Sequence, residues 1–169
     1  MQPALLVITG AAAAGKSTVG DHLRQRPELC VIDGDVLGRG AAATAGGRRD
    51  YVGFWRFVLS VCDEIRSSGL IPVVPCICLP DQVLAAVEGE VVHFLGLLSE
   101  PSTIRQRIAA RPGVSEVPSP DTHVQFDQTL RSVTVPKPHT WERHDVASNQ
   151  LAATLAVASD WASRHTTCP

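Results

Sequence analysis

A lysine and two hydroxyl residues, Lys16, Ser17 and Thr18, follow a glycine close to the start of the chain. The residues from Gly10 to Ser17 read G-A-A-A-A-G-K-S and match the phosphate-binding pattern G-x-x-x-x-G-K-S/T. Glycines in this pattern let backbone N–H groups turn inward around a phosphate, and the next helix adds its positive N-terminal end. The lysine reaches the β- and γ-phosphates, and the hydroxyl after it binds Mg²⁺. The stretch predicts a site for ATP and Mg²⁺ formed by Gly10, Ala11, Ala12, Ala13, Ala14, Gly15, Lys16, Ser17 and Thr18.

Two other interpretations of this stretch are a hydrophobic leader peptide and an alanine-rich helix. A leader peptide carries a positively charged residue before its apolar run, and the sequence has none before Leu5. The run from Pro3 to Ala14 is too short to span a bilayer as a helix, as is every other apolar segment. Because an apolar segment precedes the pattern and a helix-compatible segment follows it, we favour phosphate binding and expect no membrane partner.

Two carboxylates, Asp33 and Asp35, follow the second apolar segment of the chain. In an extended chain residues two apart face the same way, so we expect both carboxylates to point into one site. Phosphoryl transfer to a hydroxyl needs a group that orients the acceptor and takes its proton, and an acid that holds Mg²⁺ or its waters. We assign the first role to Asp35 and the second to Asp33, with Ser17 as the other metal-binding residue. An ordinary Asp-Gly turn is the alternative interpretation.

Arginines later in the chain are candidates to cover the phosphate. Arg107 and Arg111 lie where a predicted helix ends and a proline-rich loop begins, and because they are four residues apart they share a face. We expect both to be catalytic by stabilising the charge that develops on the transferring phosphate, and Arg107 also to bind the nucleotide. A solvated helix face, with cations favoured at its C-terminus, is the alternative.

Residues that bind the acceptor are expected near a segment rich in glycine and alanine, at about residues 37–50. Arg48 and Arg49 have the charge to hold an anionic or polyol acceptor, and an ordinary surface loop is an equally good interpretation. Tyr51 is a third acceptor-binding candidate. The helical spacing of Tyr51 and Trp55 is, however, more typical of a core than of a substrate-stacking pair.

The elements that must position these residues alternate along the chain. Short apolar segments predict β-strands, and segments with helical spacing separate them. The predicted strands are apolar on both faces, which indicates a parallel sheet with helices on both sides. Ligands of such folds bind at the carboxyl ends of the strands. The predicted strands are residues 4–9, 29–32, 71–79, 91–98 and 141–146, and the predicted helices are 15–24, 51 to a stop at 69, 80–87, 101–110, 121–133 and a last helix capped by Ser148.

Length and composition describe one soluble globular domain spanning residues 1–169. The formal net charge of −2 offers no basic field for a nucleic-acid backbone, so nucleic-acid binding is not favoured. The cysteines fit no disulfide or metal-binding framework. Cys76 and Cys78 lie in an apolar run, where a buried, reduced role is expected. These features favour a cytoplasmic protein.

Three stretches together resemble the small P-loop phosphotransferases, a group that includes nucleoside monophosphate, shikimate, gluconate and adenylylsulfate kinases. They read GAAAAGKST from Gly10, DGD from Asp33 and IRQRIAARPG from Ile104. The resemblance implies a three-layer α/β fold with a five-stranded parallel sheet in the strand order 2-3-1-4-5. It also implies a mobile acceptor-binding segment at about residues 37–50, a lid at about 111–122 and an adenine site near 146–149.

The same resemblance assigns roles residue by residue. It implies that Lys16, Ser17 and Thr18 bind the nucleotide and Mg²⁺. It also implies that Asp33 and Asp35 serve the metal and the acceptor. Arg107 and Arg111 resemble the arginines of the lid. The chain departs from each named member of the group, so the resemblance does not identify the acceptor.

These observations predict an ATP-dependent phosphotransferase that moves the γ-phosphoryl group to a small metabolite or to a nucleoside or nucleotide. One alternative is a kinase acting on nucleic-acid ends, which would want a basic groove that this balance of charge does not offer. The other is an ATP-binding regulatory or assembly protein without transferase activity, against which the two acids count because binding alone needs no base. The sequence does not decide between a monomer and a homodimer.

Overall fold

The computed structural model describes residues 4–38, 50–110, 119–147 and 150–166. At its centre five parallel strands form a sheet in the order β2-β3-β1-β4-β5. This arrangement confirms the predicted α/β class and the predicted strand order. The strands are β1 (Leu5–Gly10), β2 (Leu29–Val31), β3 (Ile71–Pro75), β4 (Val92–Leu98) and β5 (Thr140–Asp145).

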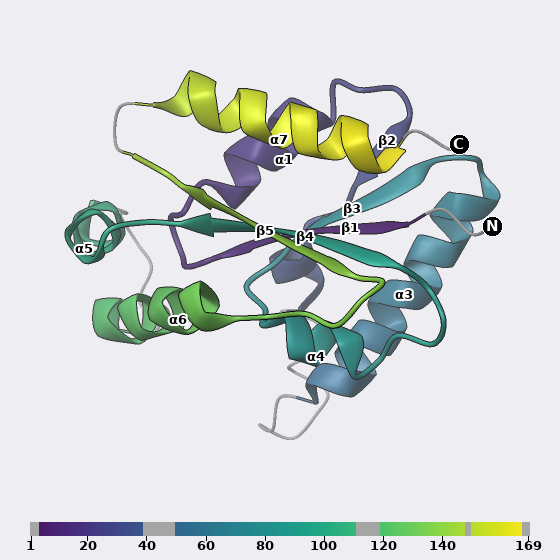
Figure 1. The fold of residues 1–169 in the computed structure, drawn as a ribbon, viewed down its shortest axis with the longest axis horizontal. Helices are drawn as coiled ribbons and strands as arrows, with labels where there is room; N and C mark the ends of the chain where they lie inside the picture. Colours follow the sequence, from purple (N-terminus) through teal and green to yellow (C-terminus); the bar gives the residue numbers. More distant parts are fainter. Residues whose placement is uncertain (1–3, 39–49, 111–118, 148–149, 167–169) are drawn as a thin grey trace.

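Helices cover both faces of the sheet and make a three-layer molecule (Figure 1). Helices α1 and α7 lie on one face, and α3, α4 and α6 lie on the other. Among the described residues, no helix combines the length and the apolar character that crossing a membrane requires. The helices are α1 (Lys16–Leu23), α3 (Tyr51–Ser67), α4 (Pro80–Leu84), α5 (Pro101–Ala109), α6 (Pro120–Ser132) and α7 (Leu151–Thr166), and residues 34–38 are also helical.

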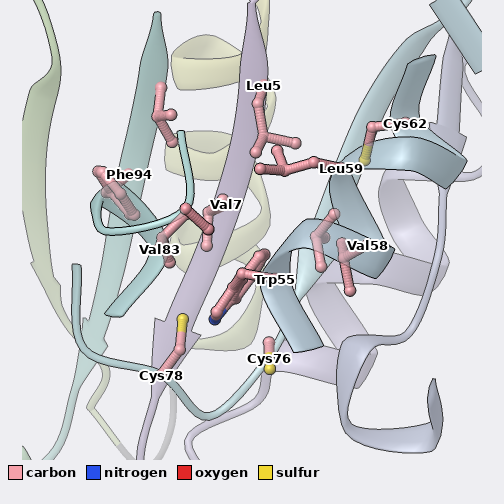
Figure 2. Packing of buried hydrophobic residues seen from close by; sticks show 13 residues of the cluster. Leu5, Val7, Trp55, Val58, Leu59, Cys62, Cys76, Cys78, Val83 and Phe94 are labelled. Carbon is pink, nitrogen blue, oxygen red and sulfur yellow. The ribbon is translucent and has the colours of Figure 1, made fainter. Parts of the chain in front are cut away.

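The central strand β1 separates two hydrophobic cores. Successive side chains of a strand point to opposite faces, so Leu5 and Val7 enter the core under α3, while Leu6 and Ile8 enter the core under α1 and α7. Figure 2 shows Trp55 of α3 reaching toward β1 beside Val7. Trp55 is fully buried, which confirms the core role expected for it. The same expectation was wrong for Tyr51, which begins the helix and is 37% exposed.

Strand β3 ends at Pro75, whereas the apolar pattern predicts a strand as far as residue 79. Side chains of the neighbouring elements take up the backbone groups that would continue the ladder. The Ile77 N–H donates to Asp35 Oδ1 at 2.7 Å, and the Cys78 N–H donates to Thr9 Oγ1 at 3.3 Å. The chain after β3 therefore turns out of the sheet and passes beside the end of β1.

Two helix boundaries also differ from the sequence prediction. Helix α4 ends at Leu84, not at residue 87. Helix α6 begins at Pro120 and is capped by Ser119, whose hydroxyl accepts a hydrogen bond from the Thr122 N–H at 3.3 Å. The prediction that Asp121 caps this helix was wrong: proline is favoured at the first helical position, which moves the cap one residue earlier. Asp121 lies in the first turn instead.

Candidate functional site

The loop between β1 and α1 contains two residues with left-handed backbone angles, Ala13 with φ of 62° and Gly15 with φ of 101°. Left-handed residues in such a loop aim successive backbone N–H groups to one side, which favours anion binding. Gly10 is needed for a different reason, because a Cβ atom there would lie 2.5 Å from the carbonyl oxygen of Leu97 on β4. Glycines thus stand at a sharp turn and at a close backbone approach, as the sequence pattern predicts.

Helix α1 begins directly after this loop and has no side-chain cap at its N-terminus, where Gly15 is the N-cap residue. The N–H groups of its first turn, at the positive end of the helix, are therefore not capped by a side chain and can bind an anionic ligand. The side chains of Ser17 and Thr18 in this turn are exposed. Backbone donors and hydroxyls at one helix end fit the phosphates of a nucleotide.

Lys16 folds back over the loop, with its side chain only 7% exposed. Its Nζ donates hydrogen bonds to the carbonyl oxygens of Gly10 at 2.9 Å and Ala11 at 3.1 Å. The same Nζ lies 3.8 Å from Asp35 Oδ2. A buried ammonium group needs oxygen partners of this kind, and phosphate oxygens have the same chemistry.

Asp35 reaches the lysine from the helical segment 34–38, which follows β2. Its Oδ1 accepts the hydrogen bond from Ile77 described above, and its Oδ2 faces Lys16. One oxygen is therefore fixed by the backbone, which orients the other. A carboxylate held in this way can accept a proton from a hydroxyl group or bind a cation.

Asp33 has a different local role from the one that its spacing predicts. Its Oδ1 accepts hydrogen bonds from the backbone N–H groups of Asp35 at 3.0 Å and Val36 at 3.1 Å. Asp33 therefore caps the helical segment 34–38, and the prediction that the two acids lie in extended chain was wrong. Aspartate is a favoured N-cap residue because its carboxylate satisfies the first amides of a helix. Its role at a metal stays a prediction.

Helices α5 and α6 lie side by side next to the phosphate-binding loop (Figure 1). Ala11 of the loop packs in one buried cluster with Ile104 of α5 and Val124 of α6. From α5, Arg107 Nη1 donates a hydrogen bond to the carbonyl oxygen of Ala13 at 3.2 Å. The structure therefore brings a predicted phosphate-binding arginine to the loop.

Several other predicted site residues lie outside the described residues. They are Arg48 and Arg49 of the expected acceptor-binding segment and Arg111 of the expected lid. Tyr51 is described: it begins α3, and its exposed fraction is 37%.

His123 of α6 also contacts the loop, and sequence reasoning did not single it out. The Ala12 N–H donates to His123 Nδ1 at 3.4 Å, and the residue is only 4% exposed. Burial lowers the pKa of His123, the charge of Lys16 lowers it further, and Asp35 acts in the opposite direction. The imidazole is therefore held in its neutral form beside the site.

Asp127, one turn after His123, anchors α6 to the end of β4. Its carboxylate accepts a hydrogen bond from the Ser99 N–H at 2.9 Å and forms an ion pair with Arg131 at 2.9 Å. Burial raises the pKa of Asp127, while the Ser99 amide and Arg131 oppose that shift. The signal in the sequence is a pair of polar residues four apart, His123 and Asp127, that share the buried face of the helix with Val124 and Leu130.

The cysteines near the site have a structural role. Cys76 and Cys78 are buried and free, which confirms the expected reduced, buried state, although both follow β3 instead of lying in it. The hydrogen bond with Cys78, burial and the nearby Asp35 all raise the pKa of the Cys76 thiol. A protonated thiol is a poor nucleophile and a poor metal ligand.

Mg²⁺ requires few protein ligands when a nucleotide supplies phosphate oxygens. In the part of the chain that the structure describes, no group of three or more His, Cys, Asp or Glu residues could hold a metal ion. The exposed hydroxyl of Ser17 at the start of α1 fits such a shared site.

No protein-family model and no curated protein sequence matches the chain. Solved structures match it over nearly its whole length. A sugar kinase from a Janibacter species is 18% identical with a TM-score of 0.70, and the match covers 98% of this chain and 99% of that one. The fold is that of the P-loop kinases. At this identity the likeness establishes the P-loop kinase fold alone.

Two further structures with the P-loop kinase fold agree. A gluconokinase from Sinorhizobium meliloti is 22% identical with a TM-score of 0.61, covering 98% of this chain and 94% of that chain. The APS kinase of Mycobacterium tuberculosis, solved in complex with AMPPNP and APS, is 17% identical with a TM-score of 0.56, covering 95% and 99%. The resemblance to P-loop kinases that three short sequence stretches predict is therefore confirmed at the level of the fold.

Proposed function

We propose that this protein is an ATP-dependent phosphotransferase that moves the γ-phosphoryl group to a small hydroxyl- or phosphate-bearing metabolite. The observation that carries the proposal is the 3.8 Å approach of Lys16 Nζ to Asp35 Oδ2. A phosphate-binding lysine and a carboxylate from a separate element then face each other at the carboxyl ends of the strands. Binding a nucleotide needs the first group, while transfer to a hydroxyl also needs the second.

Each group has a distinct role in the proposed reaction. Lys16 and the amides of the first turn of α1 hold the β- and γ-phosphates of ATP, and Ser17 supplies a ligand for Mg²⁺. Bound Mg²⁺ neutralises charge on the phosphate oxygens. Asp35 orients the acceptor hydroxyl and takes its proton, and Arg107 stabilises the charge that develops on the transferring group. The acceptor is proposed to lie beside Asp35 and to be bound by the segment of about residues 37–50, with Arg48, Arg49 and Tyr51 as its proposed contacts.

The remaining proposed parts follow the same assignment. Asp33 is proposed to hold a water of the Mg²⁺ shell with the carboxylate oxygen that does not cap the helix. Arg111 is proposed to act with Arg107 over the γ-phosphate, within a lid at about residues 111–122 that excludes water. The names of the similar structures, a sugar kinase, a gluconokinase and an APS kinase, support a small-molecule acceptor.

The test is a screen for ATP consumption with and without small acceptors. The purified protein is incubated with ATP and Mg²⁺ and with sugars, sugar acids, polyols, nucleosides or nucleoside monophosphates. We expect one acceptor class to raise ADP formation and to yield a phosphorylated product detectable by mass spectrometry. Lys16→Ala should reduce this turnover roughly a hundredfold or more, because it removes a charge that stabilises the transition state.

The chain offers a matched control for that variant, because Lys16 and Lys137 are its only lysines. Lys137 is exposed, and Lys137→Ala should leave turnover unchanged. Tight ATP binding without turnover on any acceptor would instead favour a nucleotide-binding regulatory protein. Turnover stimulated only by the ends of DNA or RNA strands would instead favour a kinase that acts on nucleic-acid ends.

A further inference from the structure

We propose that His123 is a phosphate-contacting residue whose Nε2–H donates a hydrogen bond to the γ-phosphoryl group of the bound nucleotide. The inference deepens the proposed function and rests on it for the identity of the ligand. It adds a residue from α6 to a site otherwise formed by the loop after β1, Asp35 and Arg107.

The contact with the loop fixes the ring and defines its tautomer. The Ala12 N–H donates to Nδ1 of His123, so Nδ1 carries no proton. Burial also keeps the ring neutral, as the lowered pKa of His123 indicates. A neutral imidazole with a bare Nδ1 carries its proton on Nε2. Nε2 is therefore a hydrogen-bond donor.

This donor is buried and lacks a partner. Nε2 of His123 has no hydrogen-bond partner among the residues that the structure describes, although the residue is 96% buried. Buried polar groups in native proteins are almost always paired, and an exception calls for an explanation such as a ligand. A ligand oxygen that accepts this hydrogen bond would satisfy the group.

The surroundings of the ring indicate which oxygen that is. The ring contacts the backbone of Ala12, and the carbonyl oxygen of the preceding residue accepts a hydrogen bond from Lys16 Nζ at 3.1 Å. Lys16 Nζ in turn lies 3.8 Å from Asp35 Oδ2, so the ring stands beside the part of the loop that holds the proposed transfer site. The amides of the first turn of α1 are available for the β-phosphate. In the proposed reaction the γ-phosphoryl group lies between Lys16 and the acceptor held by Asp35, and we therefore assign the Nε2–H of His123 to an oxygen of that group.

Two amide substitutions separate the two nitrogens of the ring. In His123→Asn the amide oxygen stands near the position of Nδ1, so the variant keeps an acceptor for Ala12 and loses the donor at Nε2. In His123→Gln the amide nitrogen stands near the position of Nε2, so the variant keeps the donor and loses the acceptor. Calorimetry with Mg²⁺ then measures the affinities of each protein for ADP and for the non-hydrolysable ATP analogue AMPPNP.

We expect His123→Asn to lower the preference for AMPPNP over ADP by roughly tenfold or more, the usual effect of one hydrogen bond to a charged group. His123→Gln should keep that preference within about threefold. A residue that merely supports the loop would affect both ligands alike, because both contain the β-phosphate. Equal loss of both ligands, or an unchanged preference in His123→Asn, overturns the proposal.

A measurement on the unmodified protein covers the case in which a variant does not fold. In the ¹⁵N spectrum of its histidines, the Nε2 signal of His123 should shift on addition of AMPPNP and remain nearly in place with ADP. A signal that responds identically to both ligands overturns the proposal.

Failure of this inference is distinguishable from failure of the proposed function. The binding measurements need no acceptor, so a protein that shows the expected preference and transfers phosphate to nothing retains the His123 contact and loses the kinase assignment. A protein that phosphorylates an acceptor while His123→Asn keeps its full preference for AMPPNP retains the kinase assignment and loses the His123 contact.

Discussion

The two oxygens of the Asp35 carboxylate face different partners. Oδ1 accepts a hydrogen bond from the Ile77 N–H at 2.7 Å, and Oδ2 lies 3.8 Å from Lys16 Nζ. In the proposed reaction, phosphate oxygens replace the carboxylate as partners of the lysine, and Oδ2 then becomes available to a substrate hydroxyl. Because Oδ1 remains fixed by the backbone, the carboxylate does not have to be ordered at the moment of reaction.

Replacement of Asp35 by asparagine tests the proposed proton acceptor. Asp35→Asn keeps the size of the side chain and an oxygen for the Ile77 amide but removes the base, so turnover should fall roughly a hundredfold or more. The dissociation constant for ATP should change little, because the proposed phosphate contacts come from the loop and α1. Turnover is measured by ADP release with the acceptor found in the screen, and ATP binding by calorimetry.

Asp160→Asn is the matched control for that substitution. Asp160 lies on α7, its exposed carboxylate pairs with Arg164 one helical turn later, and a surface ion pair of this kind contributes little to stability. This variant should turn over at the unmodified rate. Normal turnover of Asp35→Asn would remove Asp35 from the reaction.

At the scale of elements, the site depends on how closely β1 and β4 approach at their carboxyl ends. Gly10 lies opposite Leu97 in the parallel ladder, and the phosphate-binding loop begins at that point. A side chain at residue 10 would enter the space of the Leu97 carbonyl oxygen, which belongs to the backbone and cannot rotate away. The pairing of two strands therefore sets where the loop starts.

Gly10→Ala should destabilise the fold by about 1–3 kcal/mol, the usual cost of overpacking, and should weaken ATP binding by displacing the loop. Urea unfolding measures the first effect and calorimetry the second. Gly38→Ala is the control, since a Cβ atom there meets nothing nearer than Phe54 at 3.7 Å. If both variants unfold at the same urea concentration as the unmodified protein, the steric argument is wrong.

The elements were more predictable than the contacts between them. Hydrophobic periodicity locates the strands and helices, because the spacing of apolar residues follows from which faces of an element are buried. Strand β3 ends before residue 79 because the amides that would continue it donate hydrogen bonds to side chains distant in sequence. These side chains are Asp35 and Thr9. The same limit applies to His123: its spacing from Asp127 on one face of α6 marks a polar pair, but only the packing of α6 against the loop reveals its contact with Ala12.

At the scale of the whole molecule, the proposed site and a cluster of histidines lie at opposite ends of the sheet. The loop after Gly10 follows the end of β1, whereas His93 and Thr140 stand at the beginnings of β4 and β5. His93 stacks on His165 of α7 with ring centroids 3.7 Å apart, and its Nδ1 lies 2.9 Å from Thr140 Oγ1. Burial lowers the pKa of His93 to about 4. His165 and His139 also lower this pKa, whereas Glu142 acts in the opposite direction.

This cluster predicts a dependence of stability on pH that is separate from activity. In the unfolded chain a histidine takes up a proton near pH 6.5, whereas His93 in the folded protein does so near pH 4. Between these values the unfolded state binds more protons than the folded state. The contribution of His93 to the free energy of unfolding is therefore at its maximum above pH 6.5 and falls as the pH drops toward 4. We expect a loss on the order of 2 kcal/mol from this residue, measured by urea unfolding at a series of pH values.

The substitution His93→Asn isolates this contribution, because asparagine keeps an oxygen for the Thr140 hydroxyl and does not titrate in this range. The variant should lose less stability than the unmodified protein between pH 6.5 and 4. Its ATP affinity at pH 7 should be unchanged, since the cluster and the loop lie at opposite ends of the strands. Identical pH dependence in the two proteins would mean that another group carries the effect, and a changed ATP affinity would mean that the two ends of the sheet are coupled.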